Sequence, residues 1–339
     1  MAQNRLSLRF SVLAATGGFF FVLLFSFAAF AGTRSLSFID GISAAVSLLS
    51  GSGNGGSSAT ILLHLRLPRA TGATLCGASL SVSGLLLQLS LNNALASPGI
   101  IGVNAGAGFF ALLASLAFPY ATLIRAAGAF SGALLAVFIV YLISERAGIS
   151  KTSLVLSGMA VSSLLTAGID ILITAYPEII SDKIAFSLGG FQNLSIASVR
   201  IAAPIIALSL VAALLLAGGI DLFALGDEAA FGLGLNVRAC RLAAIATAAV
   251  LAGTAVSVCG LLGFVGLLVP NLVRLGGKQN TRQSIILCVI LGADFLLLCD
   301  VLSRTLFFPY ELPVGLFLSC MGSPFFIWML VSRRKRLSV

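Results

Sequence analysis

The feature that most constrains this chain is a series of apolar runs, each about 20 residues long, that recurs along its length. An α-helix of that length crosses a hydrocarbon core about 30 Å thick. Backbone polar groups inside a bilayer must be paired internally, which makes the helix the natural spanning element. Of the 339 residues, 59% are hydrophobic and 9% are charged, too little charge to cover a soluble domain. The sequence therefore predicts an all-α membrane protein with many spans.

The apolar runs divide into about ten predicted transmembrane helices. The eighth is short and contains Pro270, so we expect it to cross only part of the membrane. The first has a longer apolar core than a secretory signal, and we retain it as a helix. The predicted spans are residues 10–31, 69–89, 97–116, 125–143, 154–175, 199–218, 240–259, 264–275, 285–307 and 313–331.

The distribution of Lys and Arg predicts that both termini are cytoplasmic, in a multi-pass protein of the cytoplasmic (inner) membrane surrounded by lipid. Arg5 and Arg9 lie near the N-terminus, and "RRKR" occupies positions 333–336. Threading ten spans places the basic loops "SERAGISK", "NVRACR" and "VRLGGKQNTR" inside, together with the acidic segment 221–238. The net charge of +9 thus mostly reflects topology rather than binding of nucleic acid. The basic residues that this threading places at the outer face are Arg34, Arg66, Arg69, Arg125, Lys183 and Arg304.

The residues that usually build metal or nucleotide sites are sparse. The six cysteines are scattered singly, and His64 is the one histidine. "GSGNGG" at positions 51–56 fits a glycine-rich nucleotide motif, but no strand precedes it, and a linker is the better interpretation. No GxxxxGK[ST] phosphate loop occurs. We therefore expect no enzymatic activity and no cofactor in this chain, so that any ATP and Mg²⁺ would bind to a separate subunit.

Two segments resemble each other. "LCGASLSVSGLL" begins at Leu75, and "LAGTAVSVCGLL" begins at Leu251. Because they lie five spans apart, they run in opposite directions, which indicates an inverted repeat with halves of roughly 66–175 and 238–331. The alternative is chance similarity between two helices rich in Gly, Ser and Leu. GxxxG pairs at positions 102 and 106 and at 128 and 132 predict close helix packing.

The segment "RLPRATGATLCGASLSVSGLLLQLSLNNALASPGIIGVNAGAG" resembles the FecCD-type permeases, and "LFALGDEAAFGLGLNV", "GLLGFVGLLVPNLVR" and "DVLSRTLFFPYELPVG" continue the likeness in family order. These permeases are the membrane subunits of ATP-binding-cassette importers for iron–siderophores, haem and cobalamin. The resemblance implies ten helices per subunit and a second permease subunit, identical or different. It also implies two ATP-binding subunits and an extracytoplasmic substrate-binding protein as partners.

The resemblance also assigns a role to residues 224–236, which would dock into a groove of the ATPase. Acidic side chains near a helix start favour its positive end, and a charged projection can register against a basic groove. The alternative is a solvated cytoplasmic loop. The predicted ATPase-coupling residues are Ala224, Leu225, Gly226, Asp227, Glu228, Leu233 and Gly234.

Two further sites follow from the resemblance. Asn93, Ala94 and Leu95 match a turn that forms the cytoplasmic gate, although Ala94 replaces the family's proline. Arg66, Arg69 and Arg304 match positions that pair with glutamates of the binding protein, as guanidinium forks can. Snorkelling toward lipid headgroups is the alternative, and Arg304 can also pair with Asp300, four positions earlier.

Charged residues inside the spans are costly and mark candidate pathways. Asp170 lies in the fifth span, which resembles a gating helix, and is our pathway candidate; Asp294 lies in the ninth. Asn271 stands where the family commonly has histidine. The sequence therefore predicts a permease subunit that moves a bulky metal chelate into the cytoplasm by alternating access, driven by a separate ATPase. The alternative is an ion-coupled secondary transporter, for which Asp170 and Asp294 would have to form the relay.

Overall fold

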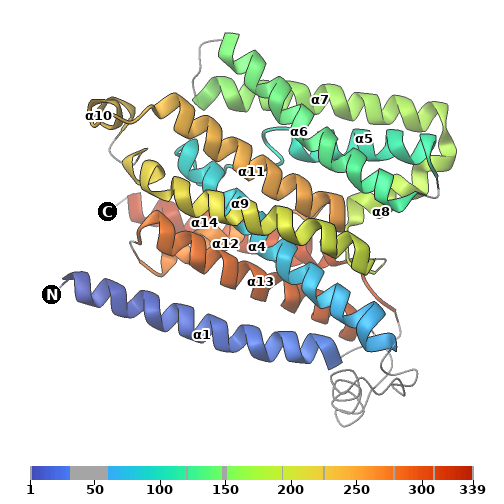
Figure 1. Cartoon of the computed structure of the whole chain (residues 1–339), viewed down its shortest axis with the longest axis horizontal. Helices are drawn as coiled ribbons and strands as arrows, with labels where there is room; N and C mark the ends of the chain where they lie inside the picture. Colours follow the sequence, from blue (N-terminus) through green and yellow to red (C-terminus); the bar gives the residue numbers. More distant parts are fainter. Residues whose placement is uncertain are drawn as a thin grey trace.

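The computed structural model describes residues 2–30, 60–119, 121–146, 151–192, 194–223, 226–277, 279–307 and 310–337. Helix is the only regular secondary structure within these ranges, as predicted. The helices in Figure 1 are α1 (Ala2–Phe30), α4 (Leu67–Ser90), α5 (Val103–Ala117), α6 (Thr122–Arg146), α7 (Lys151–Ala175), α8 (Ile180–Leu188), α9 (Ile196–Leu222), α10 (Asp227–Gly232), α11 (Val237–Cys259), α12 (Val265–Leu275), α13 (Thr281–Thr305) and α14 (Val314–Leu337), with a π-helical turn at Leu62–Arg66 and a 3₁₀ turn at Pro177–Ile179.

The described residues contain seven helices long and apolar enough to cross a membrane, and three shorter apolar helices, namely α5, α12 and α14. Each predicted span overlaps one of these helices. The short eighth span is confirmed as α12, with 11 residues and Pro270 inside it. The third span begins later than predicted, because α5 starts at Val103 and not at position 97. Pro98 lies in the preceding turn, and Gly102 precedes the helix with a left-handed φ of 88° that favours glycine.

The long helices run between two ends of the bundle, with α10 and both chain termini at one end and α8 at the other (Figure 1). We call them the α10 end and the α8 end. Polar contacts between helix ends agree with this arrangement. At the α8 end, Arg69 at the start of α4 reaches Asp300 near the end of α13. At the α10 end, Arg241 at the start of α11 reaches the carbonyl of Ser90 at the end of α4.

The helices of the two proposed repeat halves pack in a matching scheme. Helix α4 packs on α12 and α13, and α11 packs on α5 and α6. Within one half α5, α6 and α7 contact one another, and in the other α12 contacts α13 and α14, which also touch. Helices α4 and α11 cross directly, where the Ser79 and Ser83 hydroxyls donate to the carbonyls of Leu251 and Ala248 at 2.8 and 2.6 Å. This pairing supports the inverted repeat, whose limits at 66–175 and 238–331 remain a prediction.

Glycines bring neighbouring helices into backbone contact. A Cβ on Gly84 would overlap the Gly266 carbonyl, and one on Gly106 would overlap the Gly132 carbonyl. The first contact joins α4 to α12, across the two proposed halves, and the second joins α5 to α6 within one half. The predicted close approach is thus confirmed for Gly106 and Gly132. In lipid, such close packing replaces the hydrophobic drive that joins helices in water.

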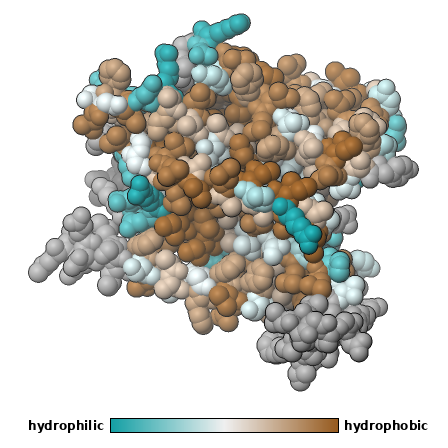
Figure 2. All heavy atoms as spheres, viewed as in Figure 1, coloured by the Kyte–Doolittle hydropathy of each residue, from teal (hydrophilic) through white to brown (hydrophobic). Residues whose placement is uncertain are grey.

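The outer surface of the bundle is apolar. Figure 2 shows hydrophobic residues over much of the visible face, with the hydrophilic ones gathered in a few places. Helices α7 and α9 expose large aliphatic side chains, among them Leu164, Leu208 and Leu215. A soluble protein rarely exposes so many apolar groups together, so this surface fits contact with lipid or with another membrane subunit.

Candidate functional site

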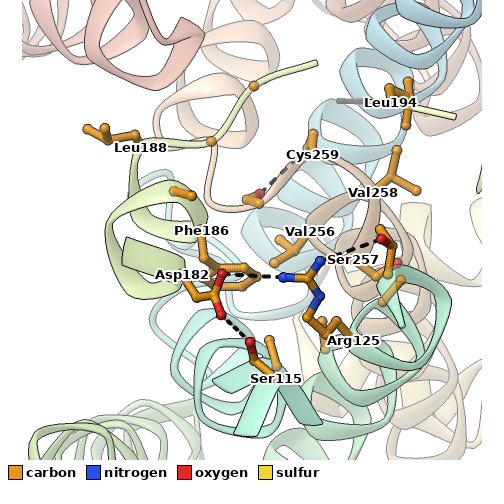
Figure 3. A pocket seen from close by; sticks show the side chains of 18 of the residues that line it. Ser115, Arg125, Asp182, Phe186, Leu188, Leu194, Val256, Ser257, Val258 and Cys259 are labelled. Carbon is orange, nitrogen blue, oxygen red and sulfur yellow. Dashed lines mark hydrogen bonds and ion pairs between the residues drawn. The ribbon is translucent and has the colours of Figure 1, made fainter. Parts of the chain in front are cut away.

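The α8 end holds a cavity of about 620 Å³ between α5, α6, α8 and the end of α11 (Figure 3). Its charged groups form one cluster. Arg125 Nη1 lies 3.3 Å from Asp182 Oδ1, and the Ser115 hydroxyl donates to the other carboxylate oxygen of Asp182. Arg125 was predicted to lie at the outer face, but its partner was not predicted, because 57 positions separate the two residues.

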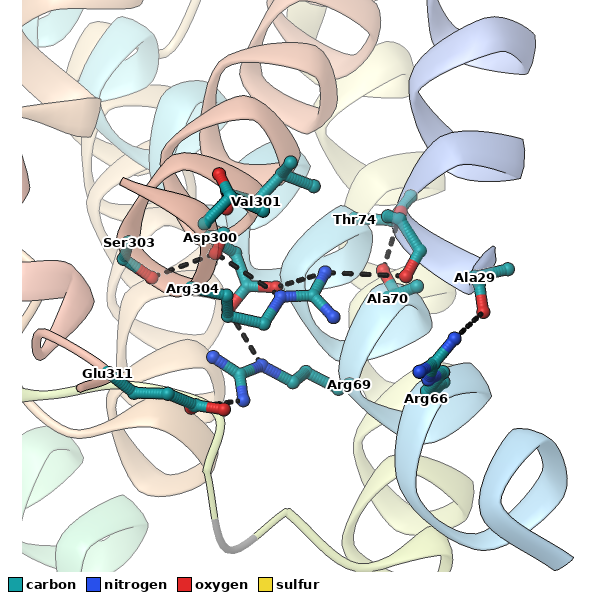
Figure 4. A network of polar contacts seen from close by, with 12 residues as sticks. Ala29, Arg66, Arg69, Ala70, Thr74, Asp300, Val301, Ser303, Arg304 and Glu311 are labelled. Atoms are coloured by element: carbon teal, nitrogen blue, oxygen red, sulfur yellow. Dashed lines mark hydrogen bonds and ion pairs between the residues drawn. The ribbon is translucent and has the colours of Figure 1, made fainter. Parts of the chain in front are cut away.

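A second polar cluster at the α8 end joins α4, α13 and the loop before α14 (Figure 4). Asp300 is fully buried, and its carboxylate lies 2.9 Å from Arg69 Nε and 3.1 Å from Arg304 Nη2. Arg69 Nη1 also lies 2.9 Å from Glu311 Oε2. The predicted pairing of Arg304 with Asp300 is therefore confirmed. Buried charges require such partners, because each charge loses its hydration.

The three arginines expected to face a binding protein are engaged inside the chain. The exposed fractions of Arg66, Arg69 and Arg304 are 6, 9 and 4%. Arg66 Nη1 and Arg304 Nη2 also donate to the carbonyls of Ala29 and Ala28, at 3.5 and 3.3 Å, and so fasten α1 to the bundle. Asp300 and Glu311 thus hold Arg69 and Arg304 within the chain, and the Ala29 carbonyl holds Arg66. Their part in docking remains a prediction.

At the opposite end, the predicted coupling segment contains a separate short helix, α10. Ala224 and Leu225 lie outside the described residues. Gly226 and Gly234, which flank the helix, have φ of 96° and 85°, values that glycine adopts without strain. Asn236 then caps α11 by accepting from the Ala239 amide at 3.1 Å. Two glycine turns therefore set α10 apart from the bundle, as Figure 1 shows.

The three acids of this segment have different surroundings. Asp227 Oδ1 lies 2.7 Å from Nη2 of Arg241, whose side chain is nearly buried. Arg241 also donates from Nε to the Ser90 carbonyl at 3.2 Å and lies over the Phe223 ring at 5.3 Å. Asp221 Oδ1 accepts from the Thr281 amide at 2.9 Å. Asp221 and Asp227 are therefore internal anchors, while Glu228 is exposed and forms no ion pair within the described ranges.

The coupling segment exposes large apolar side chains beside its acids. Phe231 is 74% exposed and Leu233 is 64% exposed. Leu233 was among the predicted coupling residues, but Phe231 and the anchor Arg241 were not. An aromatic residue in a segment predicted to be cytoplasmic was the available signal for Phe231. Nothing local pointed to Arg241, which is 14 positions from Asp227.

The predicted gate residues form a compact turn after α4. The Asn93 side chain accepts from the Leu95 amide at 2.9 Å, and Asn92 has a left-handed φ of 48°. Asn271 Nδ2 donates to the Ala94 carbonyl at 3.2 Å and to the Leu267 carbonyl at 2.7 Å. The two positions that depart from the family pattern, Ala94 and Asn271, thus contact each other. An amide hydrogen bond holds the turn where the proline is missing.

The two acids considered for a pathway lie apart from these clusters. Asp170, on α7, is exposed and lies 3.2 Å from Lys183 Nζ of α8. Asp294, on α13, is buried and has no hydrogen-bond partner in the described part of the chain. Their helices have different neighbours, α5 and α6 for α7, and α4, α1 and α12 for α13. The described residues contain no group of three or more His, Cys, Asp or Glu able to hold a metal ion.

Comparison with known proteins gives a consistent result. The model of the FecCD transport family matches residues 20–332. The Fe(3+)-citrate import system permease protein YfmD of Bacillus subtilis is 38% identical over 81% of this chain and 83% of its own. The hemin transport system permease protein HmuU of Yersinia pestis is 34% identical over 82% and 85%. A solved metal-chelate type ABC transporter in an inward-facing conformation has a TM-score of 0.84 at 23% identity, covering 95% of this chain and 99% of that one.

Proposed function

The chain belongs to the FecCD transport family, and from this we infer that it is the membrane-spanning permease subunit of an ATP-binding-cassette importer for metal chelates. The observation that carries this conclusion is the family match over residues 20–332. Relatives that import Fe(3+)-citrate and hemin support a bulky iron chelate as the substrate. The chain supplies the path, and a separate ATPase supplies the energy for alternating access.

The α10 end faces the cytoplasm in this proposal, and the α8 end faces outward. The basic loops and termini gather at the α10 end, as the positive-inside rule requires. The proposed assembly has two permease subunits, two ATP-binding subunits that hold ATP and Mg²⁺, and a binding protein at the α8 end. The buried Arg66, Arg69 and Arg304 would contribute to docking by shaping that surface, because their guanidinium groups are already engaged.

The coupling segment is the proposed contact with the ATPase. Phe231 and Leu233 offer an apolar anchor, and Glu228 offers an exposed charge that fixes its orientation. Arg241 connects the proposed ATPase contact to the predicted gate turn. It links Asp227 of α10 to the Ser90 carbonyl, and the gate turn follows Ser90 directly. A displacement of α10 is therefore transmitted to Asn93, Ala94 and Leu95 through one guanidinium group.

Co-purification with the ATP-binding subunit tests this proposal. We expect the double variant Glu228→Lys, Phe231→Asp to lose the ATPase while the permease keeps its thermal unfolding temperature, because both side chains are exposed. Glu145→Lys is the control for the Glu228→Lys change: it reverses the charge in the same way at an exposed position near the end of α6, outside the segment. A double variant that still assembles and transports would contradict the coupling role.

A further inference from the structure

The cavity at the α8 end takes no part in the coupling segment or the gate turn, yet it has the volume of a ligand site. Its 620 Å³ falls within the roughly 300–1,000 Å³ typical of small-molecule pockets. Leu112, Phe186 and Val256 provide apolar walls, while Ser115, Arg125 and Asp182 converge as polar groups. An apolar wall with a few convergent polar groups is the usual composition of a binding site.

Arg125 is incompletely satisfied in this cavity (Figure 3). Its contacts with Asp182 Oδ1 and Thr122 Oγ1 are 3.3 and 3.5 Å, longer than the roughly 2.7–3.2 Å of a good N–H···O bond. Its Nε is buried without a hydrogen-bond partner in the described part of the chain. A guanidinium carries five N–H donors in a planar fork. Arg125 therefore retains donors for a further oxygen group.

Asp182 does not depend on Arg125 alone. The Ser115 hydroxyl donates to one carboxylate oxygen, and Arg125 contacts the other. A ligand that drew Arg125 away would leave Asp182 with the serine and with solvent, since its side chain is 38% exposed. The ion pair is thus a contact that an incoming anion can replace, whereas the fully buried Asp300 offers no such exchange.

We propose that this cavity binds the transported chelate through a carboxylate of the chelate, with Arg125 as the ligand-binding residue and Asp182 as its competing partner. The proposal rests on the proposed function and narrows its substrate class to iron chelates that carry a free carboxylate. A fork–fork pair between guanidinium and carboxylate gives orientation as well as affinity. Ser115 and the apolar wall then position the rest of the chelate at the outer mouth of the path.

The test is equilibrium binding of radiolabelled iron(III) citrate to the permease–ATPase complex in lipid nanodiscs, without binding protein. We expect saturable binding that excess iron(III) citrate displaces and a neutral iron(III) trihydroxamate does not. Arg125→Gln should weaken binding by about tenfold or more, the loss of about 1.4 kcal/mol, and Arg125→Lys should retain part of it. Asp182→Asn should bind as tightly as the wild type or more tightly, because it removes the competitor. Arg200→Gln, an exposed cation of α9 outside the cavity, is the matched control.

Several results would overturn the assignment: no saturable binding, displacement by the trihydroxamate, wild-type binding by Arg125→Gln, or equal losses in Arg125→Gln and Asp182→Asn, which would make the pair structural. The competition experiment needs only the wild-type complex, so it tests the proposed chelate site even if a substitution prevents assembly of the complex. ATP-driven chelate uptake is measured separately. If uptake persists while Arg125→Gln binds the probe normally, the permease function stands and the cavity assignment falls.

Discussion

The two ends of the bundle use their polar residues in opposite ways. At the α8 end, Arg66, Arg69 and Arg304 are buried, and Asp300 and Glu311 neutralise part of their charge inside the chain. At the α10 end, one buried arginine anchors a helix whose outward residues, Phe231 and Leu233, are apolar and exposed. The difference shows that buried arginines mark internal attachment points at both ends, while the exposed apolar side chains of the α10 end mark a surface available to a partner.

The largest effect should come from breaking the α8-end cluster. Asp300→Asn leaves Arg69 and Arg304 without their shared buried carboxylate, and removing one partner of a buried pair costs about 3–5 kcal/mol. Thermal unfolding of the purified permease in detergent measures this loss. Asp170→Asn is the control, because its pair with Lys183 is exposed and worth about 0–1 kcal/mol. Similar melting temperatures for the two variants would contradict the contrast between buried and exposed pairs.

A smaller effect should follow from releasing α10. Arg241→Gln removes the ion pair to Asp227 and weakens the contacts with Ser90 and Phe223, at a cost of about 1–3 kcal/mol. We expect faster amide hydrogen exchange in residues 226–236 than in the wild type, with exchange in α13 unchanged. Equal acceleration in both regions would indicate general unfolding and would remove Arg241 as a specific anchor.

The smallest of these effects should come from the gate turn. Asn271→Ala removes the hydrogen bond to the Ala94 carbonyl, worth about 0.5–1.5 kcal/mol. Labelling of a cysteine introduced at Leu95 should become faster, because the turn is held less firmly. Restoring the family pair with Ala94→Pro and Asn271→His should slow the labelling again. If labelling is the same in all three proteins, the contact does not hold the turn.

The helices were predictable from the sequence, but the side-chain contacts between distant segments were not. Hydropathy and length suffice to locate α11 and α12, because a span must be long and apolar wherever it lies. The start of α5 was missed, because the turn chemistry of Pro98 and Gly102 overrides an apolar run. Asp300 and Arg304 were paired correctly, since four positions on one helix bring side chains together. The pairs Arg69–Asp300 and Arg125–Asp182 join distant segments, and no local sequence pattern indicates them.

The most direct test of the account is uptake of iron(III) citrate into proteoliposomes that contain the purified permease and are supplied with its binding protein, with and without the ATP-binding subunit. The account predicts accumulation only when the subunit and ATP are both present, and none with a proton or sodium gradient alone. Accumulation by the chain alone on an ion gradient would contradict it, and would direct attention to Asp294, the buried carboxyl without a hydrogen-bond partner in the described part of the chain.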